Sequence, residues 1–191
     1  MGFSQIKPSI RDLQQFISPN AGESSRLIQI TETTGKNLSA KSSEFAVWED
    51  EEIAALIIDL KTQDSLPYDY LKLATKELSC PIFALKSSIS KEDLFELRRQ
   101  DFDGVITSAS KLDIATIEAL MLQAKSMNFY FILSCANLEE INKILPTKPR
   151  FLHVSQVIDS LPDVIQSGNS WLLGETNLLN QMPLKGIVET V

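Results

Sequence analysis

Residues 80–97, CPIFALKSSISKEDLFEL, hold the pattern that decides the fold class. The run 81–86 is apolar apart from its last residue, Lys86, as expected of a parallel strand that is buried on both faces. Ser90 and Asp93 then have the spacing of a capping box, in which two side chains satisfy exposed amides in the first turn of a helix. A buried strand that turns at once into a capped helix is the repeating half of a βαβ unit.

The same order of strand and helix continues along the chain. Asn137 and Glu140 repeat the capping-box spacing, and residues 113–127 place apolar side chains at helical intervals on one face. This alternation predicts right-handed βαβ units and a parallel sheet that is either doubly wound or closed into a barrel. The predicted strands are 26–31, 54–59, 81–86, 103–108, 129–135, 150–155 and 170–174.

The composition indicates a single globular domain over residues 1–191. The chain is 43% hydrophobic and 23% charged, and its length suits one sizeable core better than two. The formal net charge is −7 and the 18 Lys and Arg residues form no basic stripe, so we do not expect a nucleic-acid partner. No run approaches the roughly 18 apolar residues of a membrane span, and the N-terminus lacks the apolar core of a signal peptide. We therefore expect a cytoplasmic protein without a membrane partner.

The sequence offers few residues for a metal or a cofactor. Cys80 and Cys135 each lie in an apolar run without a second thiol or histidine nearby, which suits buried free thiols in a reducing compartment. His153 is the only histidine, so most zinc and triad geometries are excluded, and its mid-strand position favours a hydrogen-bonded core residue. The glycine-rich nucleotide-binding patterns are also missing. We expect neither a metal nor a cofactor.

A longer layout connects the middle of the chain to a known family. The stretch CPIFALKSSISKEDLFELRRQDFDGVITSASKL follows, without a gap, a pattern like LPVLRKDFI with a later GADAVLL strand. YFILSCANLEEINKIL falls where VLVEVHDEEELERAL would, and YDYLKLATKELSCP is similar to LEYLREVREAVSLP. In this layout residues 48–145 resemble indole-3-glycerol phosphate synthase, a (β/α)₈ barrel lyase of tryptophan biosynthesis. The resemblance implies a TIM barrel.

The resemblance also implies which positions would carry out catalysis, and in this chain uncharged residues occupy them. The lysine that acts as general acid in RKDF corresponds to Leu85, and Lys86 comes one residue later. The glutamate of VEVHD corresponds to Ser134, and the lysine of the first strand to Thr31. Ring closure with decarboxylation and dehydration needs a proton donor, a proton acceptor and a charge-stabilising group. Because strand side chains alternate, Lys86 is expected to point toward the helix layer unless a bulge redirects it.

The C-terminal part resembles the family's last two strands, which bind the substrate phosphate through their loops and a helix N-terminus. Gly174 and Glu175 match the last of these motifs, and Ser134 and Ser155 are expected at strand ends that line the barrel mouth. Only seven strands are found, so either the sixth or the seventh family strand is missing, and EFAVW (44–48) is the candidate for an eighth. We expect an α/β fold, a TIM-barrel-like (β/α) parallel barrel that is incomplete or rearranged, with about seven βα units.

These observations predict a degenerate relative of indole-3-glycerol phosphate synthase that lacks the lyase activity and binds a small phosphorylated or anionic ligand at the mouth. The candidate catalytic residue is Lys86, and the candidate ligand-binding residues are Thr31, Ser134, Ser155, Gly174 and Glu175. One alternative is an active lyase with relocated groups, Lys86 among them. Another is a non-catalytic scaffold or interaction module, such as a homo-oligomer that covers the strand edges exposed by a missing unit.

Overall fold

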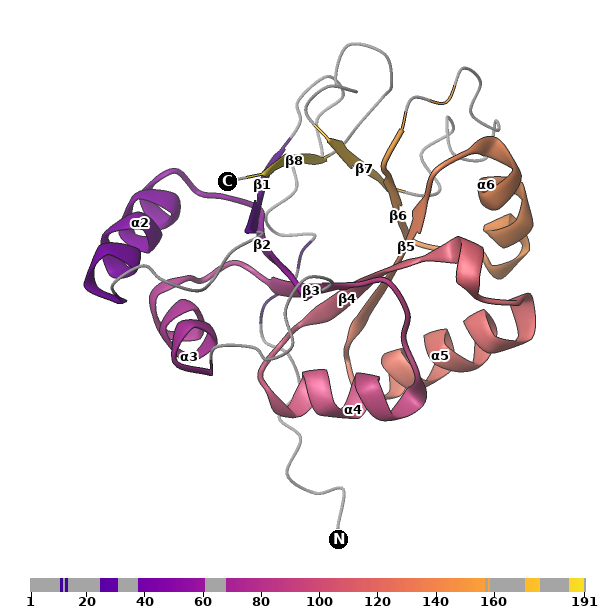
Figure 1. Ribbon diagram of the computed structural model, residues 1–191, viewed down its shortest axis with the longest axis horizontal. Coiled ribbons are helices and arrows are strands. Elements are labelled where there is room, and N and C mark those ends of the chain that lie inside the picture. Colours follow the sequence, from indigo (N-terminus) through magenta and orange to yellow (C-terminus); the bar gives the residue numbers. More distant parts are fainter. Residues whose placement is uncertain are drawn as a thin grey trace, which may run out of the picture.

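Eight parallel strands close into one barrel, in the order in which they occur along the chain (Figure 1). The computed structural model describes residues 11, 13, 25–30, 38–60, 68–156, 158, 171–175 and 186–190. The strands are β1 (Ser25–Ile30), β2 (Ala55–Asp59), β3 (Ile82–Lys86), β4 (Gly104–Ser108), β5 (Tyr130–Cys135), β6 (Phe151–Val154), β7 (Trp171–Glu175) and β8 (Gly186–Thr190).

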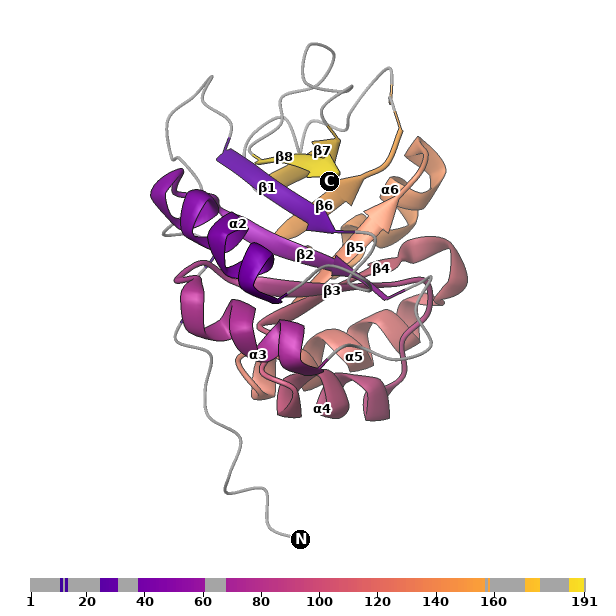
Figure 2. The same ribbon diagram turned by 60° about the vertical axis from the view of Figure 1, so that its left-hand side comes forward.

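Helices lie outside the barrel around β1–β5, as Figures 1 and 2 show. Ser90 and Asp93 form the predicted capping box, while Asn137 accepts a hydrogen bond from the Glu140 amide and the Glu140 carboxylate binds the amide of Ala136. None of the described helices is both long and apolar enough to cross a bilayer. The helices are α2 (Leu38–Asp50), α3 (Tyr68–Glu77), α4 (Lys91–Arg99), α5 (Ile114–Ser126) and α6 (Leu138–Ile144), with 3₁₀ turns η1 (Ala109–Lys111) and η2 (Leu145–Thr147).

The seven predicted strands are all present, each within one residue of its expected ends, but the expected incomplete barrel is wrong. The eighth strand is GIVET (186–190), which pairs with both β7 and β1. Within this strand only Ile187 and Val188 are apolar in sequence, so no long apolar run marks it. Backbone hydrogen bonds to the strands on both sides hold it in the sheet. The run 44–48, the expected alternative, lies inside α2. RFLHVS and WLLGE supply the sixth and seventh strands, so neither is missing.

Closure also removes the exposed strand edges on which the expected oligomer depended. Each of the eight strands has a hydrogen-bonded neighbour on both sides. A closed barrel has no free edge to be covered by a second chain.

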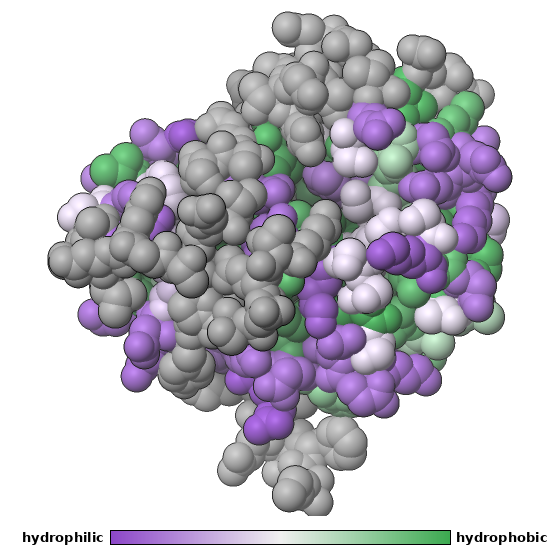
Figure 3. Space-filling view, in the orientation of Figure 1, coloured by the Kyte–Doolittle hydropathy of each residue, from purple (hydrophilic) through white to green (hydrophobic). Residues whose placement is uncertain are grey.

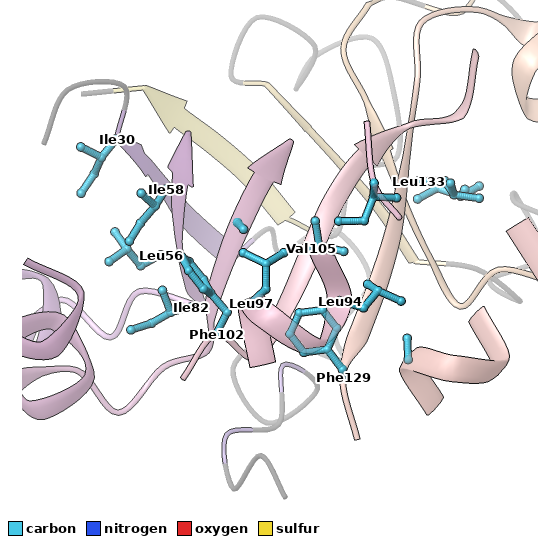
Figure 4. Packing of buried hydrophobic residues seen from close by; sticks show 14 of the residues in the cluster. Ile30, Leu56, Ile58, Ile82, Leu94, Leu97, Phe102, Val105, Phe129 and Leu133 are labelled. Atoms are coloured by element: carbon cyan, nitrogen blue, oxygen red, sulfur yellow. The ribbon is translucent and has the colours of Figure 1, made fainter. Parts of the chain in front are cut away.

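A first apolar cluster fills the space between the strands and the helices. Outward-facing strand residues such as Leu56, Ile82 and Val105 point toward helix residues such as Leu94 and Leu97 (Figure 4). A second cluster fills the barrel itself, where register sorts the inward side chains into layers of four drawn from alternate strands. One layer holds Leu27, Phe83, Ile132 and Leu173, and the next holds Ile57, Ile106, His153 and Val188.

Two residues from the N-terminal part of the chain, Arg11 and Leu13, lie at the amino-terminal end of the barrel. Leu13 is fully buried in the inner cluster, and its amide donates a hydrogen bond of 3.1 Å to the Tyr130 hydroxyl. Arg11 Nε lies 3.1 Å from Asp103 Oδ2 at the same end. Gly104 faces inward here, and a Cβ atom on it would lie 2.5 Å from the Phe83 ring and from Tyr130 Cβ. The carboxyl ends of the strands form the opposite end of the barrel, which we call the mouth.

Candidate functional site

Polar side chains replace aliphatic ones in the two inward layers nearest the carboxyl ends of the strands. This end is where TIM barrels form their binding and catalytic sites. The change in polarity marks the barrel mouth as the candidate site. By register, the described side chains of one layer are Gln29, Leu85 and Ser134, and those of the layer above it are Asp59, Ser108 and Ser155.

Ser134 has a histidine beside it, which the sequence alone did not indicate. Ser134 and His153 are register partners on β5 and β6, and Ser134 Oγ lies 2.9 Å from His153 Nδ1. His153 is 6% exposed and lies one layer below the serine, so the prediction of a hydrogen-bonded core histidine is confirmed. The contact places an imidazole nitrogen beside the Ser134 hydroxyl, a neighbour that the sequence did not indicate. The two residues are far apart along the chain, and only the sheet register brings them together.

Asp59 is the mouth residue that sequence reasoning missed. It ends β2, with the same inward phase as Ala55 and Ile57, and its side chain is buried at 7% exposure. A carboxylate is rarely buried unless it is held by polar partners or used in binding. The available signal was its place at the end of the apolar run AALIID, since strand C-termini form the site in this fold.

Lys86 lies at the correct end of the barrel but on the outer side of β3. Its Nζ atom is 2.7 Å from Asp93 Oδ1 of α4, and the two side chains are 29% and 35% exposed. Leu85, which is 5% exposed, takes the inward position. Burial tends to raise the pKa of the Asp93 carboxyl, but hydrogen bonds from Lys86 and Ser90 outweigh it and hold the pKa below its usual value. The amine is thus part of the helix cap.

The other candidate residues are distributed around the same end. Ser155 continues the β6 ladder, where its amide donates to the Cys135 carbonyl at 3.2 Å. Gly174 and Glu175 end β7, so the motif matched to the family's last strand lies on the seventh strand. Thr31 follows β1 and is outside the described residues. The structure therefore brings Ser134 and Ser155 together at the mouth and places the Lys86 amine outside it.

The two cysteines take no part in this site. Both are free and buried, as predicted. Burial is the main cause that raises the pKa of each thiol to about 12, so neither supplies a thiolate at neutral pH. Across the part of the chain that the structure describes, no three metal-binding side chains gather into one cluster.

Comparison with known proteins confirms the fold. No protein-family model and no curated protein sequence matches the chain. Among solved structures, it is similar to a mutant tryptophan synthase alpha-subunit from the hyperthermophile Pyrococcus furiosus, with 13% identity, a TM-score of 0.62, and 87% of this chain and 86% of that chain covered. A structure of the tryptophan synthase complex from the same organism has 13% identity, a TM-score of 0.61 and the same coverage. At such identity the likeness shows the fold alone.

This fold is a TIM barrel, as the family resemblance implied. The similar structures are of tryptophan synthase, so they do not single out indole-3-glycerol phosphate synthase. What the chain does must be argued from its own mouth residues.

Proposed function

We propose that this barrel is a degenerate relative of indole-3-glycerol phosphate synthase, which binds a small phosphorylated or otherwise anionic ligand at its mouth and lacks the lyase activity. The observation that carries the proposal is the orientation of β3. Leu85 occupies the inward position, and the amine of the next residue, Lys86, is held outside by Asp93. A leucine cannot donate the proton that ring closure requires.

The polar layers support ligand binding. Gln29, Ser108, Ser134 and Ser155 are half-buried rather than fully exposed, and Asp59 is buried. Ser134 is hydrogen-bonded to His153 and Ser108 to Ser110, and a hydroxyl group paired in this way still has donor or acceptor capacity for a ligand. Asp59 accepts hydrogen bonds, which favours a ligand that carries hydroxyl or amine groups as well as its anionic group.

The ends of β7 and β8 are the proposed place for the anion. Loops after the last two strands hold phosphate in many barrels of this fold. Gly174 is buried near the end of β7, directly before Glu175. Glu175 follows it at the mouth, and Thr31 follows β1 in the sequence. We assign these residues to the ligand contacts and place the function in the cytoplasm.

Two measurements test the proposal. Ribose 5-phosphate is expected to raise the melting temperature of the purified chain in a saturable way, because a ligand that binds only the folded state stabilises it. The shift is expected to shrink in Ser134→Ala and to persist in Ser126→Ala, a control on the exposed face of α5. Incubation with the indole-3-glycerol phosphate precursor is expected to give no product. Turnover that disappears in Lys86→Ala would refute the loss of lyase activity.

A second candidate is an enzyme with relocated catalytic groups. The 2.9 Å contact between Ser134 and His153 favours it, since a hydroxyl paired with an imidazole can exchange protons with a ligand. Asp59 provides a carboxylate in the same mouth. Lys86 would join them only if its ion pair with Asp93 opened. Any turnover by this route is expected to be lost in His153→Gln.

No comparable observation favours the scaffold alternative. The barrel is closed, and hydrophilic side chains cover most of the described part of the face in Figure 3, with apolar ones in smaller areas between them. Sedimentation of the purified chain tests this alternative directly. A stable homo-oligomer that ribose 5-phosphate does not stabilise would favour the scaffold over the proposed ligand-binding function.

A further inference from the structure

A cleft of about 880 Å³ opens at the end of the barrel opposite the mouth. It lies between the second half of α5, the first residues of β5 and β6, and η2. The volume is in the range of small-molecule sites, which is roughly 300 to 1,000 Å³. None of the residues assigned to the mouth lines it. The cleft is therefore a separate feature of the molecule.

The cleft is basic on an acidic protein. Lys125, Lys148 and Arg150 line it, and none of the three forms an ion pair within the described part of the chain. Arg11 also lines it, whereas Glu118 is the acidic side chain there. The whole chain carries a formal charge of −7, so this concentration of positive charge is local. A cleft lined by one sign of charge attracts ligands of the opposite sign.

The walls of the cleft are largely aromatic and aliphatic. Tyr130 and Phe131 are half-buried in the lining, and Arg150 Cζ lies 5.8 Å from the ring centre of Phe151. Leu122, at the rim, is 71% exposed, which is unusual for a large aliphatic side chain in this structure. Aromatic rings and arginine together favour the binding of a flat aromatic group of a ligand, through stacking and cation–π contacts.

The backbone holds one of the cations in a specific position. Lys148 has a φ of 52°, in the left-handed region that residues other than glycine rarely adopt. Its amide donates a hydrogen bond of 2.9 Å to the Leu145 carbonyl, and this bond caps the C-terminal end of η2. The side chain is thus presented from a fixed turn.

We propose that this cleft binds a small aromatic anion, such as an aryl phosphate or an aryl carboxylate. The anionic group pairs with Lys125, Lys148 and Arg150, and the ring packs against Tyr130, Phe131 and Leu122. The site is independent of the proposed function, because the two sites lie at opposite ends of the barrel and share no residue.

The test uses 1-naphthyl phosphate as probe, with 1-naphthol and inorganic phosphate as its two halves, in calorimetric titrations of the full chain. The probe is expected to bind more tightly than either half. The double variant Lys148→Gly with Arg150→Gln is expected to weaken binding about tenfold or more, because two of the cations are lost. Glycine adopts the left-handed conformation readily, so this variant is expected to fold. Lys91→Gln with Lys111→Gln, two exposed lysines outside the cleft, is the matched control.

Three outcomes would overturn the proposal: no saturable binding of the probe, equal binding by the double variant and the parent chain, or equal binding of naphthol. Binding that is lost in Ser134→Ala but kept in the double variant would place the probe at the mouth, which also contradicts it. Ribose 5-phosphate has no aromatic ring and tests the mouth alone. Its failure to bind leaves the expected naphthyl phosphate result unchanged, so the two proposals fail separately.

Discussion

Replacing Lys86 by methionine is expected to lower stability slightly and to leave binding at the mouth unchanged. The substitution keeps the apolar stem and removes one ion pair of 2.7 Å, whose side chains are 29% and 35% exposed. Partly exposed pairs contribute about 0.5–1 kcal/mol, since water screens them. Asp93 also keeps its hydrogen bonds with Ser90, so the helix cap remains. For a chain of this size, the loss corresponds to a melting temperature lower by about 1–4 °C.

The pH dependence distinguishes this ion pair from a general packing effect. The pKa of Asp93 is lowered in the folded state, so its contribution to stability is present above the unfolded pKa and is lost as pH falls through the folded pKa. The difference in unfolding free energy between the parent chain and Lys86→Met is therefore expected to have its largest value at pH 7 and to decrease below about pH 4. Urea denaturation at both pH values measures it.

The matched control is Lys91→Met, which changes an exposed lysine of α4 that forms no ion pair within the described part of the chain. It is expected to change stability by less than about 0.5 kcal/mol. Two results would refute the reasoning. One is a stability difference for Lys86→Met that persists at low pH. The other is unchanged stability together with a large loss of ribose 5-phosphate binding, which would place the amine in the mouth.

Three further predictions concern the packing that supports the site. Gly104→Ala is expected to destabilise the chain by about 3 kcal/mol, because its Cβ would overlap Phe83 and Tyr130, and urea denaturation should show it. Thr107→Val is expected to stabilise it by about 1 kcal/mol, since the fully buried Oγ1 atom has no hydrogen-bond partner among the described residues. Cys80 and Cys135 are expected to resist iodoacetamide at pH 7.5 until the chain unfolds, as mass spectrometry can follow; rapid labelling of the folded chain would contradict their burial.

Much of the scaffold could be predicted because its signals are local. The apolar runs of seven strands and the helix caps at Ser90 and Asn137 depend on residues a few positions apart. The eighth strand escaped prediction because GIVET has only two consecutive apolar residues. Its place is decided by pairing with β7 on one side and, on the other, with β1, which is distant in sequence. Barrel closure is thus a property of the whole sheet.

The candidate site was predictable only in part. The alternation of strand side chains correctly indicated that Leu85 faces inward and Lys86 outward, since both follow from the phase of one strand. The partners of mouth residues were beyond this reasoning. His153 was identified as a core residue, but nothing in its own strand indicated Ser134 as its partner. Asp59 was overlooked because a carboxylate at the end of a strand is usually exposed.

By itself, the sequence determined the alternating strands and helices, the capped helix after β3 and the placement of Leu85 and Lys86 on opposite faces of one strand. Each of these depends on the identity and spacing of neighbouring residues. Only the tertiary structure decided that the barrel closes with eight strands, that Asp93 holds the Lys86 amine outside, and that Ser134 meets His153. Closure and the Ser134–His153 contact depend on the register between strands, and the Lys86–Asp93 ion pair depends on how α4 packs beside β3, none of which the pattern within a single element encodes.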